Sequence, residues 1–144
     1  MAAFVACGSM TLACQQVGLS AIKPQSQQEH AVQVEFITPA ELKAKIEKNE
    51  PVTIVDLRAP SIYAQSDSKI KGSVFMKVRR VTSRLRNVPL DKEIITYCAC
   101  PADEAAIIGA QALLSSGFKR VRVLKGGWNA WRQAGGQVQP KPKI

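Results

Sequence analysis

Two cysteines in the segment Cys98-Ala-Cys-Pro-Ala-Asp103 have the residue type and position that nucleophilic chemistry requires. The apolar run at residues 93–97 is typical of a buried strand, and the Ala- and Leu-rich run at residues 104–116 is typical of a helix. A thiol reacts as its thiolate, and the unpaired N–H groups at a helix start favour that negative charge. We therefore expect a thiolate or a persulfide anion at Cys98, with Cys100 as its substitute or resolving thiol.

The rest of this loop is expected to line the substrate site, and it consists of Ala99, Pro101, Ala102, Asp103 and Glu104. The two carboxylates at its end would repel an anionic donor and oppose thiolate formation. For Asp103 we favour a structural interpretation, in which its side chain caps the helix that follows.

The spacing of the two cysteines leaves a second chemistry open. A disulfide across one intervening residue is strained and easily reduced, which suits thiol–disulfide exchange better than a structural role. Cys98 and Cys100 are therefore also candidates for a redox pair.

Strands and helices alternate along the rest of the chain. Strands are expected at residues 32–37, 52–56, 74–76, 93–97 and 120–124. Helices are expected at residues 39–48, 60–65, 78–86, 104–116 and 128–133, the first opened by a capping box from Thr38 to Glu41. A turn is expected at residues 66–68. This alternation predicts an α/β fold, with a parallel sheet covered by helices on both faces.

The length of 144 residues suits one domain with tails. We expect an N-terminal segment and linker at residues 1–33, the domain at 34–138, and a basic tail at 139–144. Residues 1–22 carry no charged side chain, and Thr11-Leu-Ala-Cys14 resembles a bacterial lipobox with Cys14 as the lipidated residue. Two alternatives stay open: export to the bacterial periplasm with membrane association through the N-terminus, or a poorly ordered cytoplasmic tail.

The formal net charge is +9, which favours small anionic substrates. We interpret most of the basic side chains as a solvated face; they are Lys69, Lys71, Lys77, Arg79, Arg80, Arg84, Arg86 and Lys92, with a second group at Lys119, Arg120, Arg122 and Lys125. The chain carries no nucleic-acid-binding motif. Its four cysteines form two pairs along the sequence, Cys7 with Cys14 and Cys98 with Cys100, and neither pair has the C-x-x-C spacing typical of a zinc site. We expect a monomer with no metal, no cofactor and no nucleic-acid partner.

From about residue 37 to residue 138 the sequence resembles a rhodanese-like domain. The matching segments are Val55-Asp-Leu-Arg58 followed by Tyr63, Ile70-Lys-Gly-Ser73, Ile94-Ile-Thr-Tyr-Cys98, and Val123-Leu-Lys-Gly-Gly-Trp-Asn-Ala-Trp131 with Gly135 beyond it. The resemblance implies a parallel five-stranded sheet flanked by helices on both faces.

The same resemblance implies a sulfurtransferase that forms a persulfide on the cysteine after the central strand. That position falls on Cys98 when counted from the strand, and on Cys100 when counted back from Gly117. Asp56 and Arg58 would form a structural pair that braces the loop. The implied partners are a small sulfur donor and a thiol acceptor, including a protein persulfide.

The loop also departs from the pattern of active thiosulfate transferases. Those proteins commonly carry a glycine within the loop and a basic residue near its end, where this chain has Pro101, Asp103 and Glu104. A catalytically inactive module that binds a partner or senses a small anion is therefore an alternative to the sulfurtransferase.

Overall fold

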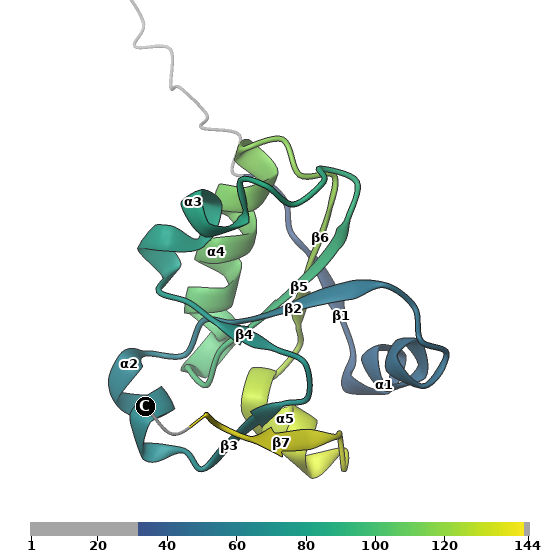
Figure 1. Cartoon of the computed structure of the whole chain (residues 1–144), viewed down its shortest axis with the longest axis vertical. Helices are drawn as coiled ribbons and strands as arrows, with labels where there is room; N and C mark the ends of the chain where they lie inside the picture. Colours follow the sequence, from purple (N-terminus) through teal and green to yellow (C-terminus); the bar gives the residue numbers. More distant parts are fainter. Residues whose placement is uncertain (1–31, 143–144) are drawn as a thin grey trace, which may run out of the picture.

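Five parallel strands form the central sheet of the computed structural model, which describes residues 32–142 (Figure 1). Across the sheet the strands follow the order β1 (Glu35–Ile37), β6 (Arg120–Leu124), β5 (Glu93–Tyr97), β2 (Val52–Asp56) and β4 (Val74–Phe75). In the register of β2 and β5, Asp56 lies beside Tyr97. The carboxyl ends of the two central strands therefore lie together, at the edge where α/β proteins place their ligands.

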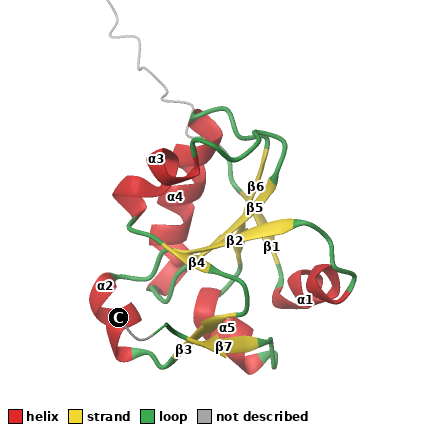
Figure 2. Cartoon of the chain, in the orientation of Figure 1, coloured by secondary structure: helices red, strands yellow, loops and turns green. Residues whose placement is uncertain are grey.

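Helices cover both faces of this sheet (Figure 2). On one face α1 (Pro39–Glu47) and α5 (Gly127–Gln133) bury Leu42 and Trp131 against strand residues such as Ile95. On the other face α3 (Val81–Leu85) and α4 (Glu104–Ser115) bury Leu85 and Leu113 against residues such as Ile94. Consecutive residues of β5 point to opposite faces, so this strand is buried on both sides. The predicted α/β class, single domain and five-stranded parallel sheet are confirmed.

The capping box predicted at the start of α1 is present. Thr38 Oγ1 accepts a hydrogen bond from the Glu41 N–H at 3.2 Å, and Glu41 Oε2 accepts one from the Thr38 N–H at 2.7 Å. Pro39 occupies the first turn, where the missing N–H costs nothing. These local signals place α1 directly after β1.

A second, two-stranded sheet was not predicted. In it β3 (Ser68–Ile70) pairs antiparallel with β7 (Val138–Pro140). The turn expected at residues 66–68 is therefore wrong at Ser68, and the domain boundary expected after residue 138 falls inside β7.

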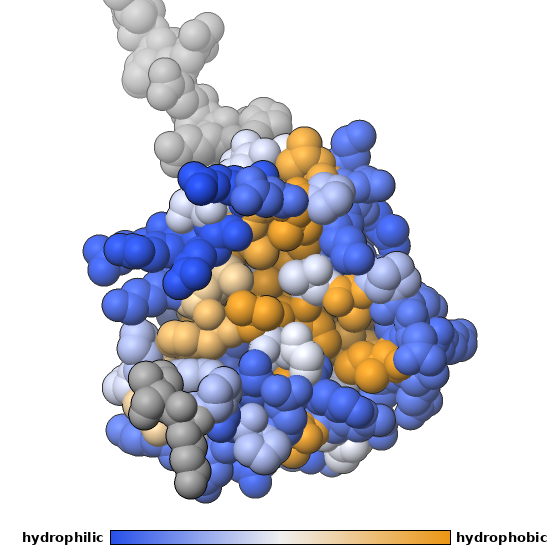
Figure 3. Space-filling view, in the orientation of Figure 1, coloured by the Kyte–Doolittle hydropathy of each residue, from blue (hydrophilic) through white to orange (hydrophobic). Residues whose placement is uncertain are grey.

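The helix expected over residues 78–86 is divided into two. A 3₁₀ turn, η1 (Val78–Arg80), precedes the short helix α3. Val81 and Leu85 are buried as the apolar spacing predicts, whereas the arginines around them are exposed. Hydrophilic residues cover the region of α3 in the space-filling view (Figure 3). The short helix α2 (Pro60–Gln65) lies at the carboxyl edge of the sheet.

The predictions for the N-terminal segment, including lipidation of Cys14, fall on residues 1–31, which lie outside the described residues. Within residues 32–142, no helix has both the length and the apolar composition needed to cross a membrane.

Candidate functional site

Cys98 leaves the sheet directly after β5, and backbone hydrogen bonds hold it on both sides. The Leu57 N–H donates to Tyr97 O at 2.8 Å, which ties the end of β5 to the residue after β2. The Trp128 N–H donates to Cys98 O at 2.8 Å, which ties Cys98 to the start of α5. The main chain of Cys98 is therefore fixed between two elements that are distant in sequence.

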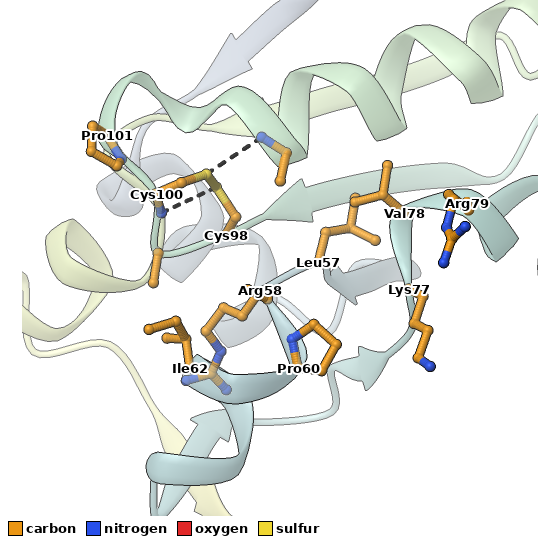
Figure 4. Close-up of a pocket in the computed structure, with 13 residues that line it drawn as sticks. Leu57, Arg58, Pro60, Ile62, Lys77, Val78, Arg79, Cys98, Cys100 and Pro101 are labelled. Atoms are coloured by element: carbon orange, nitrogen blue, oxygen red, sulfur yellow. Dashed lines mark hydrogen bonds between the residues drawn. A yellow bond between two sulfur atoms is a disulfide. The ribbon is translucent and has the colours of Figure 1, made fainter.

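Cys98 and Cys100 are joined by a disulfide, with their Cα atoms 5.7 Å apart (Figure 4). Cys98 is 1% exposed, whereas Cys100 is partly exposed. In this oxidised state, Cys100 is therefore the more accessible of the two cysteines.

Each of the two sulfurs accepts a hydrogen bond from a backbone N–H group, drawn as dashed lines in Figure 4. The Cys100 N–H lies 3.4 Å from Cys98 Sγ, and the Ala105 N–H lies 3.4 Å from Cys100 Sγ. Ala105 is in the first turn of α4, so the helix-start amide that we expected at Cys98 lies at Cys100 instead. The reason is the backbone of the 3₁₀ turn η2 (Pro101–Asp103), in which Ala102 and Asp103 have positive φ and bring α4 over Cys100.

Asp103 occupies the N-cap position of α4, but the predicted capping role is wrong. Its side chain makes no hydrogen bond to an amide of α4. Instead, Asp103 Oδ2 accepts the Gly126 N–H at 2.8 Å. With its backbone in the left-handed region (φ 56°), Asp103 turns its carboxylate toward the β6–α5 connection rather than toward its own helix. This nearly buried carboxylate links the loop to α5.

Asp56 and Arg58 form a fully buried ion pair beneath the loop. Arg58 Nη2 lies 2.7 Å from Asp56 Oδ2, and Arg58 Nε donates to Asp56 Oδ1 at 3.0 Å. The Tyr97 hydroxyl donates to Asp56 Oδ2 at 2.6 Å. Burial, reinforced by the negative charge of Asp56, raises the pKa of Tyr97 well above its usual value. The Arg58 guanidinium also lies 4.5 Å from the centre of the Trp128 ring, so it connects β2, β5 and α5.

A cavity of about 580 Å³ opens beside the disulfide, and both cysteines line it (Figure 4). Its wall is largely apolar and comes from the loop, from α2, from η1 and from the start of α4; it includes Pro60, Ile62, Val78 and Ala105. Of the loop residues expected to bind substrate, Ala99 and Pro101 line the cavity, whereas Ala102, Asp103 and Glu104 do not. In the part of the chain that the structure describes, no cluster of His, Cys, Asp and Glu suits a metal ion.

Two cations of the cavity, Lys77 and Arg79, were not predicted as site residues. Both side chains are exposed and contribute positive charge to the cavity wall. The sequence shows them only as part of a basic run, which we interpreted as a solvated face. Their position across the cavity from the cysteines depends on the pairing of β4 with β2 and on the packing of η1 against α4, and no local sequence pattern predicts either.

Comparisons with known proteins agree with this fold. The family model described as Rhodanese-like domain matches residues 38–134. A protein of Allochromatium vinosum named as a sulfurtransferase is 28% identical over 102 residues, which span 71% of this chain and 92% of that protein. The crystal structure of the Alr3790 protein from Anabaena sp. is 32% identical with a TM-score of 0.65, over 73% of this chain and 82% of that one. The crystal structure of thiosulfate sulfurtransferase from Pseudomonas aeruginosa has the same TM-score of 0.65 at 23% identity, over 75% of this chain and 20% of that one, which is a likeness of fold alone.

Proposed function

The chain belongs to the rhodanese-like domain family, and from this premise we propose that it is a sulfurtransferase that carries sulfane sulfur as a persulfide on Cys98. The observation that carries the proposal is the position of Cys98. It directly follows the central strand β5, its main chain is fixed by the Trp128 N–H, and it lines the same cavity as the cations Lys77 and Arg79. The relative named as a sulfurtransferase supports the same reaction class.

The chemistry starts from the reduced loop. The Cys98 thiolate attacks the sulfane sulfur of a donor, and the donor leaves with the electron pair of the bond that breaks. A thiol acceptor then attacks the outer sulfur and releases the Cys98 thiolate. The Cys100 N–H, which points at Cys98 Sγ in the structure, stabilises negative charge there. Lys77 and Arg79 attract an anionic donor to the cavity.

Cyanide-driven transfer tests this proposal. The reduced protein is given either thiosulfate or glutathione persulfide as the donor, and the thiocyanate formed is measured for wild type, Cys98→Ser and Cys100→Ser. We expect Cys100→Ser, in which no loop disulfide can form, to turn over, and Cys98→Ser to be slower than Cys100→Ser by about 100-fold or more, because it lacks the nucleophile. Undiminished turnover in Cys98→Ser would overturn the assignment of Cys98.

The disulfide itself favours a second candidate function, thiol–disulfide exchange by Cys98 and Cys100. In that case the protein would oxidise a dithiol substrate with no sulfane sulfur present. Mixing the oxidised protein with a reduced dithiol peptide and measuring loss of the peptide's free thiols tests this. If the peptide thiols persist for as long as they do with the reduced protein, the second function is excluded.

A further inference from the structure

The juxtaposition of the two loop sulfurs points to an activity beyond simple transfer. We propose that this site reduces sulfane sulfur to hydrosulfide: Cys100 attacks the persulfide on Cys98, expels hydrosulfide and leaves the Cys98–Cys100 disulfide, which a dithiol reductant then reopens. This inference rests on the proposed persulfide at Cys98.

The two reacting sulfurs lie within bonding distance of each other. Cys100 Sγ is bonded to Cys98 Sγ in the structure, so the loop can adopt the product geometry of this step. The atom that Cys100 meets is the inner sulfur of a Cys98 persulfide, and attack on the inner sulfur expels the outer one. An attacking group held in the correct position can act at an effective concentration of about 10⁵ M, which is far above the concentration of any free thiol.

The attacking sulfur, Cys100 Sγ, lies where the backbone favours negative charge. Cys100 Sγ accepts the N–H of Ala105, in the first turn of the 12-residue helix α4. Amide donors and the helix dipole at this place favour the thiolate of Cys100. The resolving cysteine is therefore activated by the fold, without a neighbouring histidine in the described residues.

The two cysteines differ in their exposure to solvent. Cys98 is 1% exposed and borders the cavity, so the outer sulfur of a persulfide would cover the inner sulfur from external thiols, while Cys100 adjoins the inner sulfur from within the loop. Cys100 is partly exposed, so a reductant reaches the disulfide at Cys100 Sγ. Attack there releases Cys98 as a thiolate beside the Cys100 N–H, which restores the nucleophile of the next cycle.

The atoms and electrons of the cycle balance. Cys98 first takes a neutral sulfur atom from the donor and becomes a persulfide. The Cys100 thiolate then forms the S–S bond to Cys98, the bond to the outer sulfur breaks, and this sulfur leaves with the electron pair and takes a proton from water. The sulfane sulfur is thereby reduced by two electrons, and the two cysteines are oxidised to the disulfide. The dithiol reductant supplies two electrons and two protons and becomes a disulfide itself.

A single-turnover experiment on the full chain tests the inference. All proteins carry Cys7→Ser and Cys14→Ser, so that the loop holds the only cysteines. The reduced protein is freed of reductant under anaerobic conditions and given one equivalent of glutathione persulfide. Hydrosulfide is measured with a sulfide electrode, and the protein by intact mass.

We expect this background protein to release about one hydrosulfide per chain and to end about 2 Da lighter than its reduced form, as the disulfide requires. The matched variants Cys100→Ser and Cys100→Ala should release none, gain about 32 Da, and return that sulfur as thiocyanate when cyanide is added.

The outcomes separate the two proposals. A persulfide that persists in the background protein as it does in Cys100→Ser overturns the hydrosulfide release and leaves sulfur transfer standing. Absence of both the added mass and thiocyanate in the Cys100 variants overturns sulfur transfer at Cys98, and the inference falls with it.

Discussion

Arg58 neutralises a carboxylate that has no access to water. Its guanidinium binds Asp56 through Nε and Nη2, and both side chains are fully buried. It also donates to Ser66 Oγ and Ser68 O, at 3.0 and 3.1 Å, and so ties β2 to the segment that enters β3. A single charge left in such a place is far more costly than the pair, because no solvent replaces the missing partner.

Replacing Arg58 by Ala should lower the free energy of unfolding by about 3–5 kcal/mol, because it leaves Asp56 buried without a counter-charge. Urea unfolding at neutral pH measures this. The control Arg86→Ala removes an exposed arginine and should change stability by no more than about 0.5 kcal/mol. Equal effects of the two substitutions would mean that the ion pair does not stabilise the fold.

Tyr97 should make stability dependent on alkaline pH. Burial first, and then Asp56, raises the pKa of Tyr97 in the folded protein above the value of about 10 in the unfolded chain. Below pH 10 both states keep the proton, and above it only the folded state does. The contribution of Tyr97 is therefore complete below about pH 10 and is lost as pH rises, by about 1.4 kcal/mol per pH unit.

The matched variant for this effect is Tyr97→Phe, which removes the titrating hydroxyl. Urea unfolding of the oxidised protein at several values between about pH 8 and pH 11 gives the slope of stability against pH. The variant should show a shallower decline than wild type, even though it is less stable at neutral pH. Parallel curves would show that Tyr97 ionises equally in both states.

The role of a residue could be predicted from the sequence only where the groups that it contacts lie close to it along the chain. Cys98 and Cys100 were identified because the strand, loop and helix around them lie within one continuous segment. The partner of Asp103 could not be found in the same way, because Gly126 lies 23 positions away and the positive φ of Asp103 has no marker in the sequence. The shift of the helix-start amide from Cys98 to Cys100 has the same cause.

At the scale of elements, the start of α5 holds the loop in place by close backbone contact. A Cβ atom on Gly127 would lie 2.2 Å from Cys98 O and 3.1 Å from Asp103 Oδ1. Gly127 also has φ of +51°, which side chains rarely adopt. The glycine thus lets α5 approach the residue that we propose as the sulfur carrier.

Gly127→Ala should lower stability by more than about 2 kcal/mol and reduce thiocyanate formation, because Cys98 must move to relieve the contact. Gly135→Ala is the matched control: its φ is +64° and no atom lies within 4 Å of the new Cβ. The control should lose only about 1–2 kcal/mol and keep its activity. If both variants lose stability and activity alike, backbone strain rather than contact with the loop is responsible.

The elements themselves were predictable to different degrees. β2, β5 and β6 follow β-branched or apolar runs, and α1 follows its capping box, so local sequence determines each of them. β3 and β7 are three residues each, and one of them contains Pro140. They form strands because they pair with each other across about half of the chain, which no short window of sequence can report.

At the scale of the whole molecule, positive charge is distributed unevenly between the two ends of the sheet. Near the amino ends of β5 and β6, Glu93 forms ion pairs with Lys45 at 3.2 Å, with Arg120 at 3.1 Å and with Arg122. At the cavity, the exposed Lys77 and Arg79 lie on the wall across from the cysteine loop (Figure 4). We therefore expect Lys77 and Arg79 to draw anions toward the cavity, in addition to the general attraction of the net charge of +9.

The rates at which iodoacetate and iodoacetamide alkylate the reduced loop separate the effect of charge at the cavity from the accessibility of the cysteines, because the two reagents differ mainly in their own charge. In the Cys7→Ser/Cys14→Ser background, we expect the rate with iodoacetate to fall at least about threefold when salt rises from about 20 to about 500 mM, and the rate with iodoacetamide to stay constant. The double variant Lys77→Gln/Arg79→Gln should lose most of this salt dependence.

The control variant Lys48→Gln/Lys119→Gln removes the same amount of charge from exposed positions near the amino ends of β2 and β6, and it should retain the salt dependence. Equal loss in both double variants would mean that net charge alone attracts the anion, because only a local field distinguishes the cavity from the far end of the sheet.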